Sequence, residues 1–148
     1  MTESLFGSNE PQDTIGFLLW QTTITWQRSI RKTLEEYEIN HPQFIIMSLL
    51  SWFETHGEKN NQASIIKYSK LDKMTVSKSL EKLSNLSYVS RQGDSIDTRS
   101  KKVFLTVEGK RLINRITPKI SEIDKSYFSI LTQEQQEELK NFLKKVVR

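Results

Sequence analysis

Hydroxyl-bearing and cationic side chains gather on one face of a helix predicted from Lys73 to Leu86. This face carries Met74, Thr75, Lys78 and Lys82, with Ser77 and Glu81 at its flank. Hydroxyls donate and accept hydrogen bonds, and an ammonium group donates to guanine O6 and N7 or to a phosphate, whereas a methionine packs on a thymine methyl. These groups suit contact with the base edges of double-stranded DNA. The solvated face of an ordinary helix would look similar, so this pattern alone leaves both interpretations open.

The opposite face of this helix is apolar. Val76, Leu80 and Leu83 recur at the spacing of one helical stripe, which predicts that they pack on a core. A short helix over 63–69 precedes, and a tight turn joins the two and ends at Asp72, which can cap the second helix. A short helix, a turn and an anchored second helix are the parts of a helix-turn-helix.

A basic hairpin is predicted immediately after that helix. Strand-forming residues mark Tyr88–Gln92 and Lys102–Thr106, and the polar tip between them contains Arg99. An arginine at such a tip suits a narrow minor groove, and the carboxylate of Asp97 would hold its guanidinium in place. A solvated turn is the alternative for the hairpin taken alone. The cations expected to contact phosphates are Lys73, Lys82, Arg91, Lys101 and Lys102.

The positive charge is concentrated in the same segment. The whole chain carries a net charge of +4, which alone would not select nucleic acid over another anion. Residues 67–102 contain nine basic and four acidic side chains, a net charge of +5, so the rest of the chain carries −1. The excess charge therefore coincides with the predicted helix-turn-helix and hairpin.

Several classes of chemistry are excluded or unsupported by the residue inventory. The chain has no cysteine, which excludes disulfides, thiolate zinc sites and thiol redox switches within it. The two histidines, His41 and His56, form no recognisable catalytic or metal set, so we expect no enzyme, cofactor or metal. We find no signal peptide and no apolar run of roughly 20 residues, and we expect a cytoplasmic protein without a membrane partner.

The remaining segments are predicted to be helical. One long helix covers 14–38, a second restarts at Pro42 and is apolar nearly all round, and a third covers 107–130. The last helix follows Thr132, which has the capping-box spacing to Gln135. We expect residues 1–12 to be flexible and 13–148 to form one unit, mainly α with a small β-hairpin wing.

Short motifs in a fixed order carry a family resemblance. They are Leu80-Glu81-Lys82-Leu83, Tyr88-Val89-Ser90-Arg91, Asp97-Thr98-Arg99-Ser100-Lys101, Leu105-Thr106-Val107-Glu108-Gly109 and Leu131-Thr132-Gln133-Glu134. Together, from about Gln12 to Val147, they resemble the MarR (multiple antibiotic resistance regulator) family of winged helix-turn-helix transcriptional regulators. Three positions depart from the family's small or glycine residues, namely Ile66, Lys70 and Ser87. We expect different packing of the two helix-turn-helix helices and a backbone at Ser87 unlike that of glycine.

The resemblance implies a homodimer in which different segments of the chain dimerise and bind DNA. Dimerisation helices at about 14–38 and 107–147 would interlock, and the DNA-binding winged helix would cover about 42–106. The apolar stripes of the terminal helices support a dimer independently, because a small central domain cannot cover them all. The resemblance also implies a pocket for a small aromatic or apolar effector, near Trp20, Trp26, Met47 and Trp52, although these residues also suit a plain core.

We interpret the chain as a DNA-binding transcriptional regulator that acts as a homodimer on a pseudo-palindromic operator. The alternative is a winged-helix protein-interaction module, an anti-regulator or scaffold, whose basic surface is incidental. The salt dependence of binding distinguishes these two interpretations. Affinity for DNA falls steeply as the salt concentration rises when a protein neutralises several phosphates.

Overall fold

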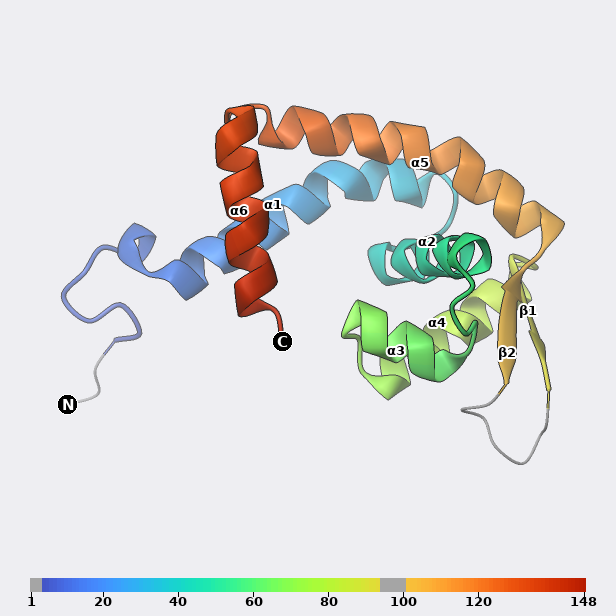
Figure 1. Ribbon diagram of the computed structural model, residues 1–148. Helices are drawn as coiled ribbons and strands as arrows, with labels where there is room; N and C mark the ends of the chain where they lie inside the picture. Colours follow the sequence, from blue (N-terminus) through green and yellow to red (C-terminus); the bar gives the residue numbers. More distant parts are fainter. Residues whose placement is uncertain (1–3, 94–100) are drawn as a thin grey trace. The chain divides into compact units, whose positions relative to one another are not determined.

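The computed structural model describes residues 4–93 and 101–148, and the predicted helices and hairpin are present in them (Figure 1). The chain divides into two compact units, one of Met1–Lys32 with Ser121–Arg148 and one of Thr33–Ile120. Helices α1 (Ile15–Glu35) and α5 (Val107–Phe128) each contribute to both units. A short 3-10 helix, η1 (Pro11–Asp13), precedes α1. The fold is therefore mainly α with one small hairpin, as predicted.

Helix α2 (His41–His56) begins and ends at residues suited to those places. The side chain of Asn40 accepts a hydrogen bond from the Gln43 backbone N–H, and the Gln43 side chain accepts one from the Asn40 N–H, both at 2.9 Å. Pro42 occupies the first turn, where its missing N–H costs no helical bond. Gly57 ends the helix at a φ of +67°. The predicted restart at Pro42 is confirmed, one residue earlier than expected.

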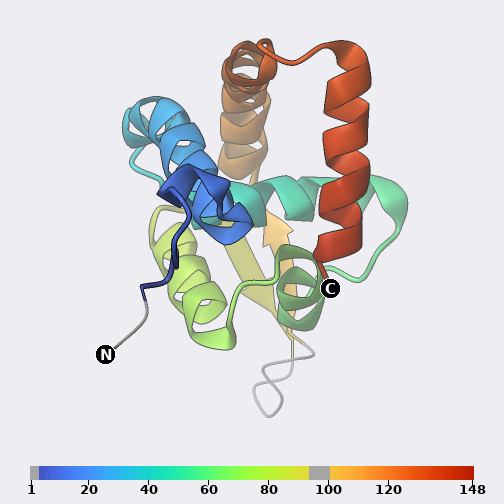
Figure 2. The same cartoon turned by 90° about the vertical axis from the view of Figure 1, so that its left-hand side faces the viewer.

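Helices α3 (Gln62–Ser69) and α4 (Lys73–Asn85) form the helix-turn-helix and lie next to each other (Figure 2). Asn61 caps α3 by accepting from the Ser64 N–H at 2.8 Å, and Asp72 caps α4 by accepting from the Thr75 N–H at 2.7 Å. Lys70 makes the sharp turn between them at a φ of +64°. These caps satisfy backbone donors at both helix starts, which fixes where α4 begins.

The core of the Thr33–Ile120 unit brings α2, α3, α4 and the hairpin together. Val76, Leu80 and Leu83 of α4 have no exposed surface, so the predicted inward face is confirmed. Ile65 is also fully buried, whereas Ile66 is only half-buried. The largest fully buried side chains of this unit also include Phe53, Leu34, Ile46, Met47, Ile116 and Val103.

The hairpin consists of the antiparallel strands β1 (Val89–Gln92) and β2 (Lys102–Leu105), as predicted. Val89 lies opposite Leu105, and these side chains are buried with Val103. The Val103 N–H donates to the Asn60 carbonyl at 2.7 Å, which ties β2 to the loop before α3. Residues 94–100 lie outside the described residues.

The junction between the hairpin and the flanking helices depends on a left-handed residue. Ser87 has a φ of +66°, so our expectation that its backbone would differ from a glycine conformation is wrong. Thr106 holds this turn: its hydroxyl donates to the Ser87 carbonyl at 2.6 Å and accepts from the Gly109 N–H at 3.0 Å. The Leu105–Gly109 motif therefore joins β2 to α5 and caps the start of that helix.

The second unit contains the first part of α1, the end of α5 and α6 (Gln133–Val146). Trp26 Nε1 donates to Asp124 Oδ1 at 2.7 Å, and Thr25 bonds to the Tyr127 hydroxyl, so α1 contacts α5 within this unit. The predicted capping box of Thr132 and Gln135 is confirmed. Helix α5 continues through Pro118.

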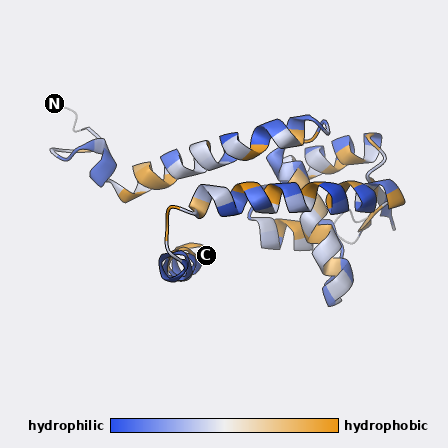
Figure 3. Ribbon diagram, turned by 90° about the horizontal axis from the view of Figure 1, so that it is seen from above, coloured by the Kyte–Doolittle hydropathy of each residue, from blue (hydrophilic) through white to orange (hydrophobic). Residues whose placement is uncertain are grey.

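Apolar side chains of this second unit remain exposed. None of the residues of α6 is buried, and Phe142 and Val146 are each 61% exposed. At the start of α1, Ile15 and Trp20 are 84% and 60% exposed, and Figure 3 shows hydrophobic residues gathered there. Contiguous exposed apolar side chains are typical of interaction surfaces.

Candidate nucleic-acid interface

The predicted base-reading residues lie on the side of α4 that faces away from the core. Met74 is 64% exposed and Lys78 is exposed, whereas Thr75 and Ser77 are half-buried. Val76, which lies between them, and Ser79 and Leu80, which follow them, are buried. The structure therefore brings the four residues together at the first two turns of a helix whose back is anchored.

Thr75 is held by Asp72 through two hydrogen bonds. The Thr75 N–H donates to one carboxylate oxygen at 2.7 Å, and the Thr75 hydroxyl donates to the other at 2.8 Å. These two bonds, the backbone one first, lower the pKa of Asp72 below its ordinary value, because they stabilise the charged form. Asp72 is therefore ionised at neutral pH, and it orients a candidate base-reading side chain as well as capping α4.

Ser77 is held by a residue that the sequence reasoning missed. The side-chain nitrogen of Gln62, at the start of α3, donates to the Ser77 hydroxyl oxygen at 2.8 Å. Gln62 is only 9% exposed. A contact between residues 15 positions apart leaves no periodic signal in the sequence, so only the packing of α3 against α4 reveals it.

The candidate phosphate contacts flank this surface. Lys73 and Lys82 are exposed on α4, Arg91 and Lys102 are exposed on the two strands, and Lys101 is half-buried. Arg99 and Asp97 fall in the part of the chain outside the described residues, so their roles at the hairpin tip stay predictions.

Comparison with known proteins assigns the fold to a family. A family model described as ArnR1-like, winged-helix domain matches residues 35–124. The HTH-type transcriptional regulator YdcH of Bacillus subtilis is 30% identical over 80% of this chain and 81% of its own length. A MarR transcriptional regulator from Methanosarcina mazei, known from its crystal structure, is 34% identical, with a TM-score of 0.72 over 89% of this chain and 92% of that one.

The chain belongs to the MarR family of winged-helix transcriptional regulators. Another similar structure of this family is Staphylococcus aureus MepR in complex with DNA, which is 26% identical and has a TM-score of 0.79 over 90% of this chain and 96% of MepR. YdcH and the Methanosarcina mazei protein are both named as transcriptional regulators. This agrees with the family resemblance that the short motifs indicated.

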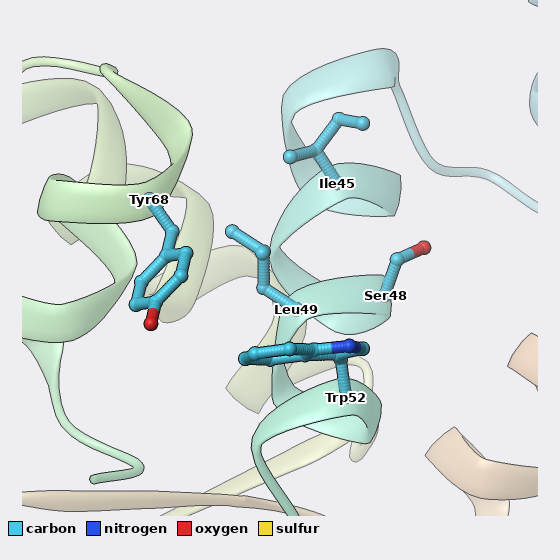
Figure 4. Close-up of a pocket in the computed structure, with 5 residues that line it drawn as sticks. All are labelled: Ile45, Ser48, Leu49, Trp52 and Tyr68. Carbon is cyan, nitrogen blue, oxygen red and sulfur yellow. The ribbon is translucent and has the colours of Figure 1, made fainter. Parts of the chain in front are cut away.

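An apolar pocket lies on the winged-helix unit of this MarR-family chain, between α2 and α3. It has a volume of about 320 Å³ and is lined by Ile45, Ser48, Leu49, Trp52 and Tyr68 (Figure 4). Ser48 directs its hydroxyl proton to the Phe44 carbonyl at 2.8 Å, which leaves the pocket wall largely apolar.

Two of the residues that line this pocket, Trp52 and Tyr68, are aromatic and have further partners. The Trp52 ring stacks on His56 with centroids 4.2 Å apart, and the Tyr68 ring lies 5.6 Å from Trp52. The Tyr68 hydroxyl donates to Glu58 at 2.7 Å. This bond is the main cause that lowers the pKa of Glu58 and raises that of Tyr68, so the pair holds the tyrosine ring in place at neutral pH.

The four residues predicted for an effector pocket lie in different places. Trp52 lines the α2–α3 pocket, whereas Met47 of the same helix is fully buried in the core. Trp20 and Trp26 belong to the part of α1 in the other unit, and Trp26 bonds to Asp124 there. The pocket residues Ile45 and Leu49 were not singled out, because the apolar pattern of α2 predicted burial all round, and Tyr68 lies on another helix, α3.

Two features are absent from residues 4–93 and 101–148. None of the helices there is long and apolar enough to cross a membrane. The same residues include no group of three or more histidine or carboxylate side chains placed to hold a metal ion.

Proposed function

We propose that this chain is a sequence-specific DNA-binding regulator that acts as a homodimer on a pseudo-palindromic operator. The observation that carries the proposal is the outward face of α4, where Met74, Thr75, Ser77 and Lys78 stand on a capped helix with a buried back face. A recognition helix needs this combination, since short polar side chains must meet base edges while the helix itself stays fixed.

In the proposed complex, α4 enters the major groove and the hairpin flanks it. Thr75, Ser77 and Lys78 contact bases, and Met74 packs on a thymine methyl. Arg99 enters the minor groove with Asp97 as its support. The two recognition helices of the dimer lie roughly 34 Å apart, one helical turn of DNA. The residues that hold phosphates are Lys73, Lys82, Arg91, Lys101 and Lys102.

The exposed apolar surface of the terminal helices supports the homodimer. Ile15, Leu18, Leu19 and Trp20 of α1 are exposed, as are Phe142, Leu143 and Val146 of α6. Burial of these side chains against a second copy would remove them from water and stabilise the pair. A regulator with two recognition helices also matches a symmetric operator, because the symmetry of protein and DNA must agree.

The α2–α3 pocket is our candidate site for an effector. Its apolar wall and the rings of Trp52 and Tyr68 suit a small aromatic or apolar molecule. Such a ligand regulates only if it binds one conformation of the protein better than another. We place the protein in the cytoplasm with the DNA it regulates, and we assign it no catalytic residue, metal or cofactor.

Selection from a random DNA pool tests the proposal. The purified protein is titrated against random and enriched sequences at several salt concentrations, and its mass in solution is measured alongside. We expect an inverted repeat bound by a dimer, with log affinity falling linearly with log salt. Binding without any enriched sequence would contradict the proposal and would favour the protein-interaction module.

A further inference from the structure

The two hydroxyls on the outward face of α4 make internal hydrogen bonds of opposite direction. A free serine or threonine hydroxyl rotates, so it donates or accepts at any base and carries little sequence information. In this structure the Thr75 hydroxyl cannot rotate without breaking its bond to Asp72, whereas the bond from Gln62 occupies one of the two lone pairs of the Ser77 hydroxyl. The direction of each bond determines what the hydroxyl offers to a ligand.

The Thr75 hydroxyl has its only proton committed to Asp72. An ionised carboxylate accepts hydrogen bonds and cannot donate them, so the 2.8 Å contact requires Thr75 to be the donor. Asp72 stays in place because the Thr75 N–H at the start of α4 also donates to it. What remains on the Thr75 oxygen is lone pairs, and the side chain is an acceptor.

The Ser77 hydroxyl is in the opposite situation. Its oxygen accepts from the Gln62 side-chain nitrogen at 2.8 Å, which leaves its proton available for another acceptor. Gln62 is itself 9% exposed and lies in the first turn of α3, so its side chain is held by the packing of the two helices. Ser77 therefore keeps its proton and one lone pair for a ligand, and the accepted bond polarises its O–H group, so that Ser77 is the better donor.

We propose that Thr75 and Ser77 read the operator with opposite hydrogen-bond polarity, and that Gln62 is a positioning residue that sets the polarity of Ser77. The inference rests on the proposed entry of α4 into the major groove. There, adenine N6 and cytosine N4 are the donors, so Thr75 contacts adenine or cytosine. Ser77 prefers the acceptors guanine O6 or N7, adenine N7 or thymine O4 to the amino group of cytosine.

Single-base profiling of the enriched operator tests this polarity. The affinity of the wild-type protein is measured for every single-base variant, and the profile is repeated for Gln62→Glu, Gln62→Leu, Ser77→Ala and Thr75→Val. A carboxylate in place of the Gln62 amide can only accept, so Ser77 must turn its proton inward and offer lone pairs to the base.

We expect Gln62→Glu to invert the preference at one base pair, from an acceptor-bearing to an amino-bearing base, by about three- to tenfold, the range of one hydrogen bond. Gln62→Leu flattens the preference at that base pair, and Ser77→Ala removes it and makes both Gln62 substitutions silent there. Thr75→Val removes the preference for adenine or cytosine at a different base pair.

The measured quantity is the affinity for one base relative to another at the same position. Added charge or altered folding changes the affinity for all sequences together and so leaves this ratio unchanged. The matched control is Gln43→Leu, which removes a 7% exposed glutamine of α2 whose side chain bonds to the Asn40 N–H instead. It should leave the base profile unchanged. Ser77→Ala provides the test again if the Gln62 variants do not fold.

The outcomes separate this inference from the proposed function. If the wild-type protein enriches an operator but the Gln62 variants leave the profile unchanged or change every position equally, the polarity inference is overturned and the proposed function stands. A wild-type preference for cytosine at the Ser77 contact overturns it as well. If the wild-type protein enriches no operator, both proposals fall.

Discussion

Gly109 lies so close to Tyr88 that a β carbon at this glycine would be 2.1 Å from the Tyr88 carbonyl oxygen and 3.1 Å from its carbonyl carbon. The same carbonyl oxygen accepts from the Thr106 N–H at 3.0 Å. The first turn of α5 therefore packs directly on the backbone that leads into β1. This contact fixes the hairpin, which carries the proposed phosphate contacts, to the body of the winged-helix unit.

Substitution of Gly109 should weaken the fold. A β carbon at that distance must displace backbone rather than a flexible side chain, so Gly109→Ala is expected to lower the free energy of unfolding by about 3 kcal/mol. Urea denaturation measures the change. Gly16→Ala is the matched control: nothing lies within 4 Å of its β carbon in α1, and we expect no loss and a gain of up to about 1 kcal/mol. Equal effects of the two substitutions would contradict the close packing.

Ser87 should accept glycine with a gain in stability. Its φ of +66° costs a residue with a β carbon about 1 to 2 kcal/mol. Glycine avoids this cost but loses more conformational entropy when the chain folds, which offsets part of the gain. Ser87→Gly is therefore expected to raise the free energy of unfolding by up to about 1 kcal/mol. Ser90→Gly, in the middle of β1, should lower it. The prediction fails if both serines respond alike in urea titrations.

The carboxyl of Asp72 should titrate below its ordinary value of 3.8. A lowered folded-state pKa means that the ionised carboxylate stabilises the fold above the ordinary pKa and that this stabilisation is lost as the pH falls through the lowered value. Nuclear magnetic resonance of the side-chain carboxyl measures the titration directly. Thr75→Val removes one of the two bonds and keeps the backbone bond, so the pKa should rise but stay below 3.8. A pKa that Thr75→Val leaves unchanged would show that the hydroxyl does not donate to Asp72.

The apolar stripe of α6 should be needed for the dimer. Phe142 is 61% exposed, and a charge placed there would be buried without a partner in the proposed dimer interface. Phe142→Glu is expected to yield a monomer by sedimentation equilibrium at concentrations where the wild-type chain is a dimer. The neighbouring Asn141→Glu adds the same charge to a polar position of α6 and should leave the mass unchanged. If the Phe142→Glu variant is still a dimer, the prediction is contradicted and the interface lies elsewhere.

The order of helices and strands was predictable because each is encoded by local patterns. The stripe of Val76, Leu80 and Leu83 marks α4, and the Thr132 and Gln135 pair marks the start of α6. Contacts between elements leave no such mark. The bond from Gln62 to Ser77 depends on how α3 packs against α4, so the sequence suggested only that Ser77 could contact a base.

Two other kinds of feature were not predicted from the sequence, for different physical reasons. Lys70 and Ser87 adopt left-handed backbone conformations that glycine usually provides, so the residues themselves did not indicate these turns, and only the family's glycines at or near these positions pointed to them. Tyr68 gave no sign of lining a pocket, because it joins Trp52 only when α3 folds against α2. The tip residues Asp97 and Arg99 lie outside the described residues, and their roles rest on the sequence.

The most direct test of the central claim compares Lys78 with Lys82 on the enriched operator and its single-base variants. Lys78→Ala is expected to change the preference at one base pair by about 1 to 3 kcal/mol, because this side chain is assigned to a base. Lys82→Ala should weaken binding to all sequences alike and reduce the slope of log affinity against log salt by about 1, because it is assigned to a phosphate. If neither substitution alters affinity for any DNA, the outward face of α4 is not the DNA-reading surface.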